Sequence, residues 1–223
     1  MHHVFDGGWL WVIPFNNHRE STNPLTSVGL MLDRRCHPHP EGPAEEEFRR
    51  IIARYPTIQR HLAAAKAVRP WVASGRLQYS SPHLLLPRIL QLPHAAGFVD
   101  PLFSSGISVL VVAVDLIAEA LLKAVAENDF AMERFQHIED IVNGAFDYYD
   151  DIVSTSFESF ASYYTWNAWN RNWVLGNVLG AFGPLSLLIR YLHSGDPADL
   201  AKTTEPSRMG VLGSHLPEVA GTL

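Results

Sequence analysis

The longest run of apolar residues lies near the middle of the chain and predicts a long helix over 106–127. Three charged residues interrupt this run, and their spacing of four puts them on one helical face: Asp115, Glu119 and Lys123. This polar stripe argues against a membrane-spanning helix, so we expect an otherwise buried helix. Asn128 follows the run and predicts its end.

After residue 130 the apolar positions recur every three or four residues, as on one face of an amphipathic helix. The stretch 130–160 therefore predicts one long helix, or two in line with a joint at Asn143–Gly144. Glycines and a proline over 176–184 predict an interruption, followed by a last helix over 185–192. Residues 196–223 are polar and rich in Pro, Gly and Thr, which predicts a mobile tail.

The first part of the chain predicts strands over 4–15 and 25–33, with a turn or bulge at Gly7–Gly8. We expect these strands to pair as a hairpin with a long turn. Within the first strand, alternation puts three residues on one face: Trp9, Trp11 and Ile13. Leu10 and Val12 then point to the opposite face.

Between these strands and the long helix, the pattern is mixed. Pro43, followed by three glutamates, predicts the start of a helix that Pro56 ends, and 57–67 predicts a second short helix. The stretches 76–80 and 84–92 predict further strands, and Pro87 interrupts the second of them. The predicted fold class is α+β, an antiparallel or mixed sheet combined with long C-terminal helices.

The same pattern divides the chain into four parts. The first, 1–95, contains the sheet and a helical insertion over 43–67. The others are the turn and helix over 96–128, a helical subdomain over 129–195 and the tail over 196–223.

Composition narrows the possible functions. The chain has 223 residues and a net charge of −6, so we expect no general attraction to nucleic acid or to an anionic membrane. The single cysteine, Cys36, excludes an internal disulfide and indicates a reducing compartment, which favours the cytoplasm. The chain shows no signal-peptide pattern and no G-x-G-x-x-G loop after a strand.

The stretch 97–107 carries the clearest candidate chemistry. Pro101 fixes one backbone angle and pushes Asp100 towards an extended shape, and Ser104 to Gly106 then begin the helix without bulk. The first N–H groups of a helix lack partners within it, and the helix dipole makes that end partly positive. This turn therefore suits an anion or an electron-rich ring edge, although a simple capped helix after a loop explains the same residues.

Other chemistry-bearing residues favour structural interpretations. His37 and His39 lie two apart between prolines, a poor metal geometry. The acids Asp147, Asp150, Asp151 and Glu158 have no histidine at matching spacing, so we expect a solvated face and no metal site. We expect His94 to be a hydrogen-bonded structural histidine.

Two motifs carry a resemblance to a known family. Trp-x-Trp-x-Ile-Pro at 9–14, followed by Asp-Pro-Leu-Phe-Ser-Ser-Gly at 100–106, resembles the flavin-dependent halogenases, which belong to the aromatic-hydroxylase-like flavoproteins. The resemblance covers 1–130 well and the helical tail more loosely. It implies the C-terminal half of such an enzyme, without the N-terminal nucleotide-binding portion and its catalytic lysine. None of the three lysines matches that position: Lys66, Lys123 and Lys202.

The resemblance also implies a reaction. Reduced FAD, supplied by a separate flavin reductase, oxygen and chloride or bromide give hypohalous acid, which halogenates a small electron-rich aromatic substrate. It places four residues at FAD: Asp100, Pro101, Gly106 and Ile107. It places the halide at Ser105 and Gly106. It assigns the barrier between flavin and substrate to Trp9, Trp11, Ile13 and Pro14.

One position departs from part of the family. Phe103 stands where tryptophan halogenases have a glutamate, and this form resembles members that act on phenols or pyrroles, often tethered to a carrier protein. Two alternatives remain open. The chain is a non-catalytic remnant or helix-rich interaction module, as the missing nucleotide loop suggests, or it is part of a flavin aromatic hydroxylase, which does not need the tryptophan motif.

Overall fold

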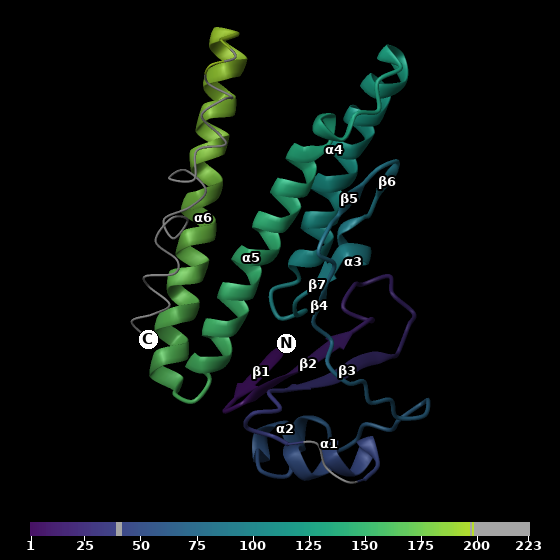
Figure 1. Ribbon diagram of the computed structural model, residues 1–223. Coiled ribbons are helices and arrows are strands. Elements are labelled where there is room, and N and C mark those ends of the chain that lie inside the picture. The colour runs from purple at the N-terminus through teal and green to yellow at the C-terminus, as the bar shows by residue number, and fades with distance from the viewer. Residues whose placement is uncertain (39–41, 197, 199–223) are drawn as a thin grey trace. The chain divides into compact units, whose positions relative to one another are not determined.

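The computed structural model describes residues 1–38, 42–196 and 198, with the side chains of 176–188 left aside. The chain forms two compact units. The first contains Met1–Ala73 and the chain from Ser156 onward, and the second contains Ser74–Thr155. Helices and small antiparallel sheets make up both units (Figure 1). The four-part division at residues 95, 128 and 195 stays a prediction.

The first unit contains a three-stranded antiparallel sheet in the order β1-β2-β3. Its strands are β1 (His2–Phe5), β2 (Gly8–Pro14) and β3 (Thr26–Leu32). The predicted pairing of the two stretches as a hairpin is confirmed. The turn considered at Gly7–Gly8 is confirmed, since Gly7 has a φ of +73° that favours glycine. The stretch 4–15 is therefore two strands, and β1 folds back onto β2.

One face of this sheet packs on two short helices, α1 (Ala44–Ile52) and α2 (Pro56–His61) (Figure 1). Leu10 and Val12 of β2 form a core with the helical residues Ile51 and Ile58 and with Phe5. The predicted start of α1 after Pro43 is confirmed, and acids occupy its first turn. α2 ends at His61 instead of continuing to residue 67, since a short helix needs packed apolar side chains to persist.

The last two helices of the described chain are long: α5 (Gln136–Ser159) and α6 (Tyr163–Ser194). α5 runs straight through Asn143–Gly144, so the joint considered there is absent. α6 likewise continues through the interruption predicted over 176–184, and the separate helix over 185–192 is its last part. A glycine costs a helix only about 1 kcal/mol relative to alanine, so glycines alone do not end it.

The helices α5 and α6 are tied together within the first unit by a buried hydrogen bond. Trp169 Nε1 donates to Ser156 Oγ at 2.9 Å, and both residues are fully buried. Ser162 caps α6 by accepting from Thr165 N. The tail predicted over 196–223 lies, except for residues 196 and 198, outside the described residues.

The second unit is built on α4 (Ser105–Glu127), the predicted long helix, which ends at left-handed Asn128 as expected. Four two-residue strands form two antiparallel pairs: β4 (Tyr79–Ser80) with β7 (Gly97–Phe98), and β5 (Leu85–Leu86) with β6 (Ile89–Leu90). The short helices are α3 (Pro93–Ala96) and the 3-10 turn Met132–Arg134.

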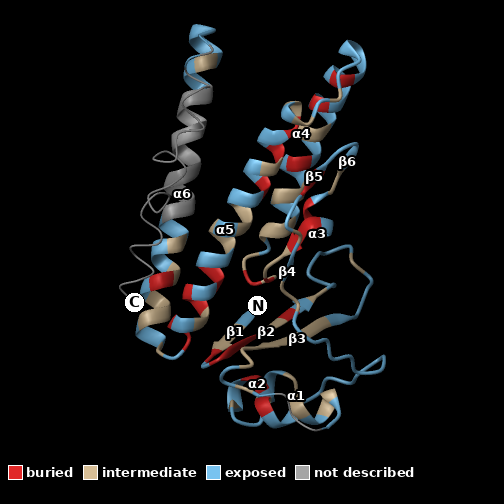
Figure 2. Ribbon diagram, viewed as in Figure 1, coloured by how far each residue is buried: buried red, intermediate tan, exposed pale blue. Residues whose placement is uncertain are grey.

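The interruption predicted at Pro87 within 84–92 is confirmed, and it divides the stretch into two short strands. The chain reverses at Pro87 and Arg88, where Arg88 has a φ of +64°, so the apolar run forms the tight hairpin β5–β6. The hairpin, α4 and α5 share one core, and the buried positions along α4 and α5 are red in Figure 2. Its fully buried members are Leu84, Leu85, Ala96, Ala113, Ala120, Ala124, Phe135, Ile138 and Val142.

Among the described residues, no helix combines the length and the apolar character needed to cross a membrane.

Candidate functional site

The turn before α4 is held by its own residues. Asp100 is only 6% exposed, and its Oδ1 accepts from the backbone N–H of Leu102 at 2.8 Å. Ser104 N–H then donates to the carbonyl of Pro101 at 3.1 Å. Because Pro101 also fixes φ, the backbone from Asp100 to Ser104 has little freedom. The carboxylate therefore shapes the turn that leads into the helix.

The helix starts without a side-chain cap. Ser104 has left-handed angles, φ +54° and ψ +27°, and its hydroxyl makes no hydrogen bond to the first turn. Ser105 and Gly106 are half-buried and Ile107 is 71% exposed. A left-handed residue followed by helical ones directs successive N–H groups to one side, a geometry that suits an anion. The dipole of a 23-residue helix adds a partial positive charge there.

His94 of α3 lies directly against this helix start. A Cβ built on Gly106 would lie 2.5 Å from His94 Nε2, so only glycine leaves room for the ring. Tyr79 Oη donates to the His94 carbonyl, and the His94 and Phe98 rings are 6.4 Å apart. The expected structural role of His94 is met by its backbone carbonyl, which accepts from Tyr79, and by the packing of its ring against Gly106.

Sequence reasoning missed His94 as a neighbour of the helix start. The available signal was Pro93, which favours the first position of a helix and so turns the chain just before the Asp-Pro motif. Gly106, twelve residues after His94, then leaves the space that the ring fills.

The strand before the turn is anchored on α5. A Cβ on Gly97 would meet the Phe146 ring at 3.0 Å, so α5 packs closely on β7. Glu139 Oε1 accepts from the N–H groups of Leu84 at 2.8 Å and Leu85 at 3.0 Å. The bond from Leu85, and next the amide of Gln136, lower the pKa of Glu139. The ionised glutamate thus fixes the β5–β6 hairpin on the helix.

The tryptophan motif lies on the face of β2 opposite Leu10 and Val12. The predicted face is confirmed by the aromatic contacts, since the rings of Trp9 and Trp11 are 5.5 Å apart. Trp9 is 1% exposed and lies 4.9 Å from the His2 ring. No acceptor for Trp9 Nε1 is found among the described residues. The two indoles form a continuous apolar wall.

Trp11 is positioned by the neighbouring strand. Its Nε1 donates to Ser27 Oγ at 3.2 Å. Its ring covers Gly29, the residue opposite it in the register, because a Cβ there would lie 1.8 Å from Trp11 Cζ2. Sequence reasoning missed Gly29, and aligning the two strands would have placed this glycine opposite the tryptophan. Ile13 is 43% exposed and Pro14 is half-buried at the strand end.

The tryptophan motif belongs to the first unit and the Asp-Pro turn to the second. Their predicted roles towards flavin, halide and substrate stay predictions.

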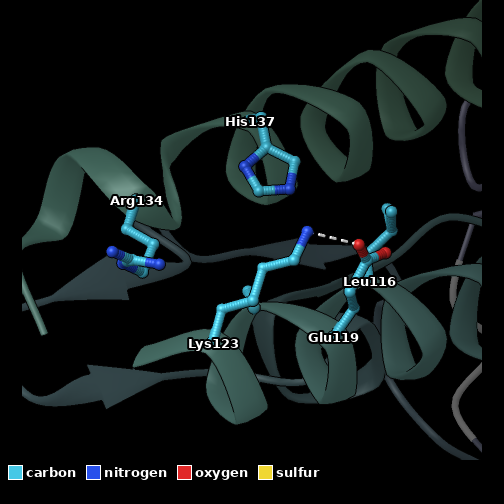
Figure 3. A pocket seen from close by; sticks show the side chains of 6 residues that line it. Leu116, Glu119, Lys123, Arg134 and His137 are labelled. Carbon is cyan, nitrogen blue, oxygen red and sulfur yellow. Dashed lines mark hydrogen bonds and ion pairs between the residues drawn. The ribbon is translucent and has the colours of Figure 1, made fainter. Parts of the chain in front are cut away.

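A pocket of about 190 Å³ lies between α4 and the start of α5 (Figure 3). Its basic side chains are already paired, Lys123 with Glu119, and Arg134 with Glu127 and Asp129. It begins about 17 Å along α4 from Ser105, from eleven residues at 1.5 Å each. The pocket is therefore separate from the helix start. It is lined by Leu116, Glu119, Ala120, Lys123, Arg134 and His137.

No group of three or more His, Cys, Asp or Glu residues that could hold a metal ion is found among the described residues. His39 lies outside them.

No protein-family profile matches the chain. It is 44% identical over 197 residues to the tetracycline 7-halogenase of Kitasatospora aureofaciens, which is 88% of this chain and 36% of that protein. It is 41% identical over 219 residues to the monodechloroaminopyrrolnitrin halogenase PrnC of Pseudomonas fluorescens, 98% of this chain and 39% of that protein. The 1H-pyrrole-2-carbonyl-[peptidyl-carrier protein] chlorinase of a P. fluorescens strain is 29% identical over 146 residues.

Solved structures agree with these relatives. The halogenase PltM in complex with phloroglucinol and FAD matches with a TM-score of 0.86 and 34% identity, over 99% of this chain and 45% of that chain. The chain thus spans about two fifths of the length of the curated relatives it matches. The resemblance to flavin-dependent halogenases that the two motifs predict is confirmed.

Proposed function

We propose that this chain, similar over nearly its whole length to one part of the flavin-dependent halogenases, supplies the flavin-ring contact, the halide site and the tryptophan barrier of such an enzyme. The finer fold assignment is part of this proposal: a portion of an aromatic-hydroxylase-like flavoprotein fold, with the nucleotide-binding portion outside it. The partial match to the relatives, 36–39% of their length, supports this division.

The observation that carries the proposal is the uncapped start of α4 behind a buried Asp-Pro turn. Asp100, Pro101, Gly106 and Ile107 would hold FAD, and the N–H groups of Ser105 and Gly106 would hold chloride or bromide. The residues present fit an anion, because the Ser104 hydroxyl does not occupy the first turn and the helix dipole favours negative charge.

When bound, reduced FAD supplies, with oxygen and the halide, the hypohalous acid that reacts with the substrate. The chain's own contribution at this point is positional. The N–H groups of Ser105 and Gly106 orient the halide, and the turn fixed by Asp100 sets where they point. A preorganised set of donors stabilises charge without rearranging during the reaction.

Trp9 and Trp11 would serve as the barrier. Their rings form an apolar wall on one face of β2, and Gly29 and Ser27 of β3 fix the Trp11 ring. A rigid wall of this kind excludes a bulky substrate and water while a small neutral oxidant passes. Ile13 would extend it along the same face, and Pro14 would mark its end, where the strand stops.

The proposed substrate is an electron-rich phenol or pyrrole. Phe103 stands where tryptophan halogenases have a glutamate, as in members of the family that act on phenols or pyrroles. The structure of PltM was solved with a phenol, phloroglucinol. One relative acts on a pyrrole attached to a carrier protein, so a tethered substrate belongs to the proposal. A flavin reductase is the proposed source of reduced FAD, and the single cysteine supports a cytoplasmic location.

The test reconstitutes the missing portion. The chain is co-expressed with the segment of PrnC that it does not match and supplied with FAD, a flavin reductase, chloride and phloroglucinol. Chlorinated phloroglucinol, identified by mass spectrometry and dependent on chloride, is expected. A hydroxylated product that forms equally without halide would instead support the hydroxylase alternative and reject the proposal.

A further inference from the structure

The helix α4 has an ordinary packed face and an ordinary charged face. Ala113, Ala120 and Ala124 are buried in the core of the second unit. Beside them runs the charged stripe predicted from the sequence, in which Lys123 pairs with Glu119. These two faces account for about half of the helix circumference.

The remaining face of α4 is apolar and exposed, which contradicts the expectation of an otherwise buried helix. At 100° per residue its apolar side chains fall within an arc of about 100°, centred about 130° from the buried alanines. Their exposed fractions lie between 44% and 73%. We call this set the outer stripe: Ile107, Val111, Val114, Leu121, Leu122 and Val125.

Single exposed apolar residues are common on soluble proteins, but a continuous stripe along a whole helix is not. A helix with apolar residues around most of its circumference is normally covered by other elements. A membrane surface is a poor candidate for the cover, because α4 carries one basic residue, Lys123, and interfacial helices carry many. The outer stripe therefore fits a protein partner.

We propose that the outer stripe is the docking surface for the nucleotide-binding portion of a flavin-dependent halogenase. This inference rests on the proposed function and names the surface by which the two portions join. The relatives contain more than half of their length beyond the part matched by this chain, so a large portion is available to cover the stripe. The stripe also begins at Ile107, in the first turn of α4, where the ring of FAD is proposed to lie.

The outer stripe leads to the proposed flavin and halide site at the start of α4. A portion seated along the stripe reaches the end of α4 at which the uncapped N–H groups lie. FAD held by that portion would then extend towards Ser105 and Gly106 without any rearrangement of the helix.

Two adjacent valines provide a matched test. Val111 lies in the outer stripe and is 61% exposed, and Val112 lies on the charged face and is 52% exposed. The variants Val111→Glu and Val112→Glu introduce the same charge at neighbouring, similarly exposed positions. A charge buried in an apolar interface without a partner weakens association, so we expect only Val111→Glu to do so.

The probe is the PrnC segment outside the match, purified as a soluble chain, and its affinity for each variant is measured by titration calorimetry without halide or substrate. The unaltered chain and Val112→Glu are expected to bind equally, and Val111→Glu at least about tenfold more weakly. Circular dichroism of each variant verifies that α4 remains helical.

Three outcomes would overturn the inference. In the first, the unaltered chain does not bind the segment. In the second, both variants weaken binding equally. In the third, the chain self-associates, and Val111→Glu converts it to a monomer without changing its affinity for the segment. The last would assign the stripe to a second copy. If the segment binds through the stripe but no chlorinated product forms, the docking surface stands and the proposed function fails.

Discussion

Gly29 provides a sharp test of how the tryptophan wall is built. The substitution Gly29→Ala adds one methyl group on β3, beneath the ring of Trp11. In the present geometry that carbon would lie 1.8 Å from Cζ2, 2.1 Å from Cη2 and 2.4 Å from Cε2 of Trp11. All three distances are far below a contact distance, so the indole or the strand must move.

The loss of stability depends on the packing and the hydrogen bond that this movement disturbs. Forcing an extra carbon into a packed site costs about 1–3 kcal/mol, and the bond between Trp11 Nε1 and Ser27 Oγ contributes about 0.5–1.5 kcal/mol. We therefore expect Gly29→Ala to lower the free energy of unfolding by about 2–4 kcal/mol. With a urea m-value of roughly 2 kcal/mol per M, the midpoint falls by about 1–2 M.

Urea unfolding is followed by near-ultraviolet circular dichroism, which responds to the packing of the Trp9–Trp11 pair. Gly144→Ala is the matched control, because nothing lies within 4 Å of a Cβ at this position of α5. It should raise stability by about 0.5–1 kcal/mol, since alanine favours a helix more than glycine does. The double variant Gly29→Ala/Trp11→Ala removes the ring and should cost much less than the sum of the single changes.

The predicted clash with Trp11 is refuted if Gly29→Ala and Gly144→Ala change the stability alike. It is also refuted if the cost of Gly29→Ala is unchanged when Trp11 is absent, because the clash would then have another source.

Three further predictions concern the helices and the turn. Trp169→Phe removes the buried bond to Ser156 Oγ and should cost about 1–3 kcal/mol in urea unfolding. Folding lowers the pKa of Glu139, so its stabilisation is present above the pKa of an unfolded glutamate (roughly 4.3) and is lost as the pH falls. The free energy of unfolding of the Glu139→Gln variant should accordingly fall less between about pH 5 and pH 3 than that of the unaltered chain. Gly106→Ala should lower the melting temperature through its contact with His94, and His94→Ala in the same chain should restore part of the loss.

The long helices and the N-terminal hairpin could be predicted because their signals are local. α4 has a continuous apolar run with a stop at Asn128, and the alternation in β2 assigned Trp9 and Leu10 to opposite faces. The helix α6 could not be bounded in this way. Its glycines suggested an interruption, but their cost is small beside the hydrogen bonds of a 32-residue helix.

The site could be predicted only as far as it is local. The Asp-Pro turn and the helix start lie within a few residues of each other, so their geometry follows from backbone preferences. The contacts of Trp11 with Gly29 and of His94 with Gly106 depend on strand register and on a reversal of the chain. The sequence pattern within one segment reveals neither the register nor the reversal.

The bonds that shape the turn before α4 have a consequence for affinity. Fixing a residue's backbone costs about 1–2 kcal/mol in conformational entropy, and four residues, 101–104, are already fixed by Asp100, Pro101 and the helix that follows. The conformational-entropy cost of fixing these residues, roughly 4–8 kcal/mol, is therefore met on folding and does not weaken ligand binding. A halide at the proposed site would then be held by a few backbone donors that need no rearrangement to receive it.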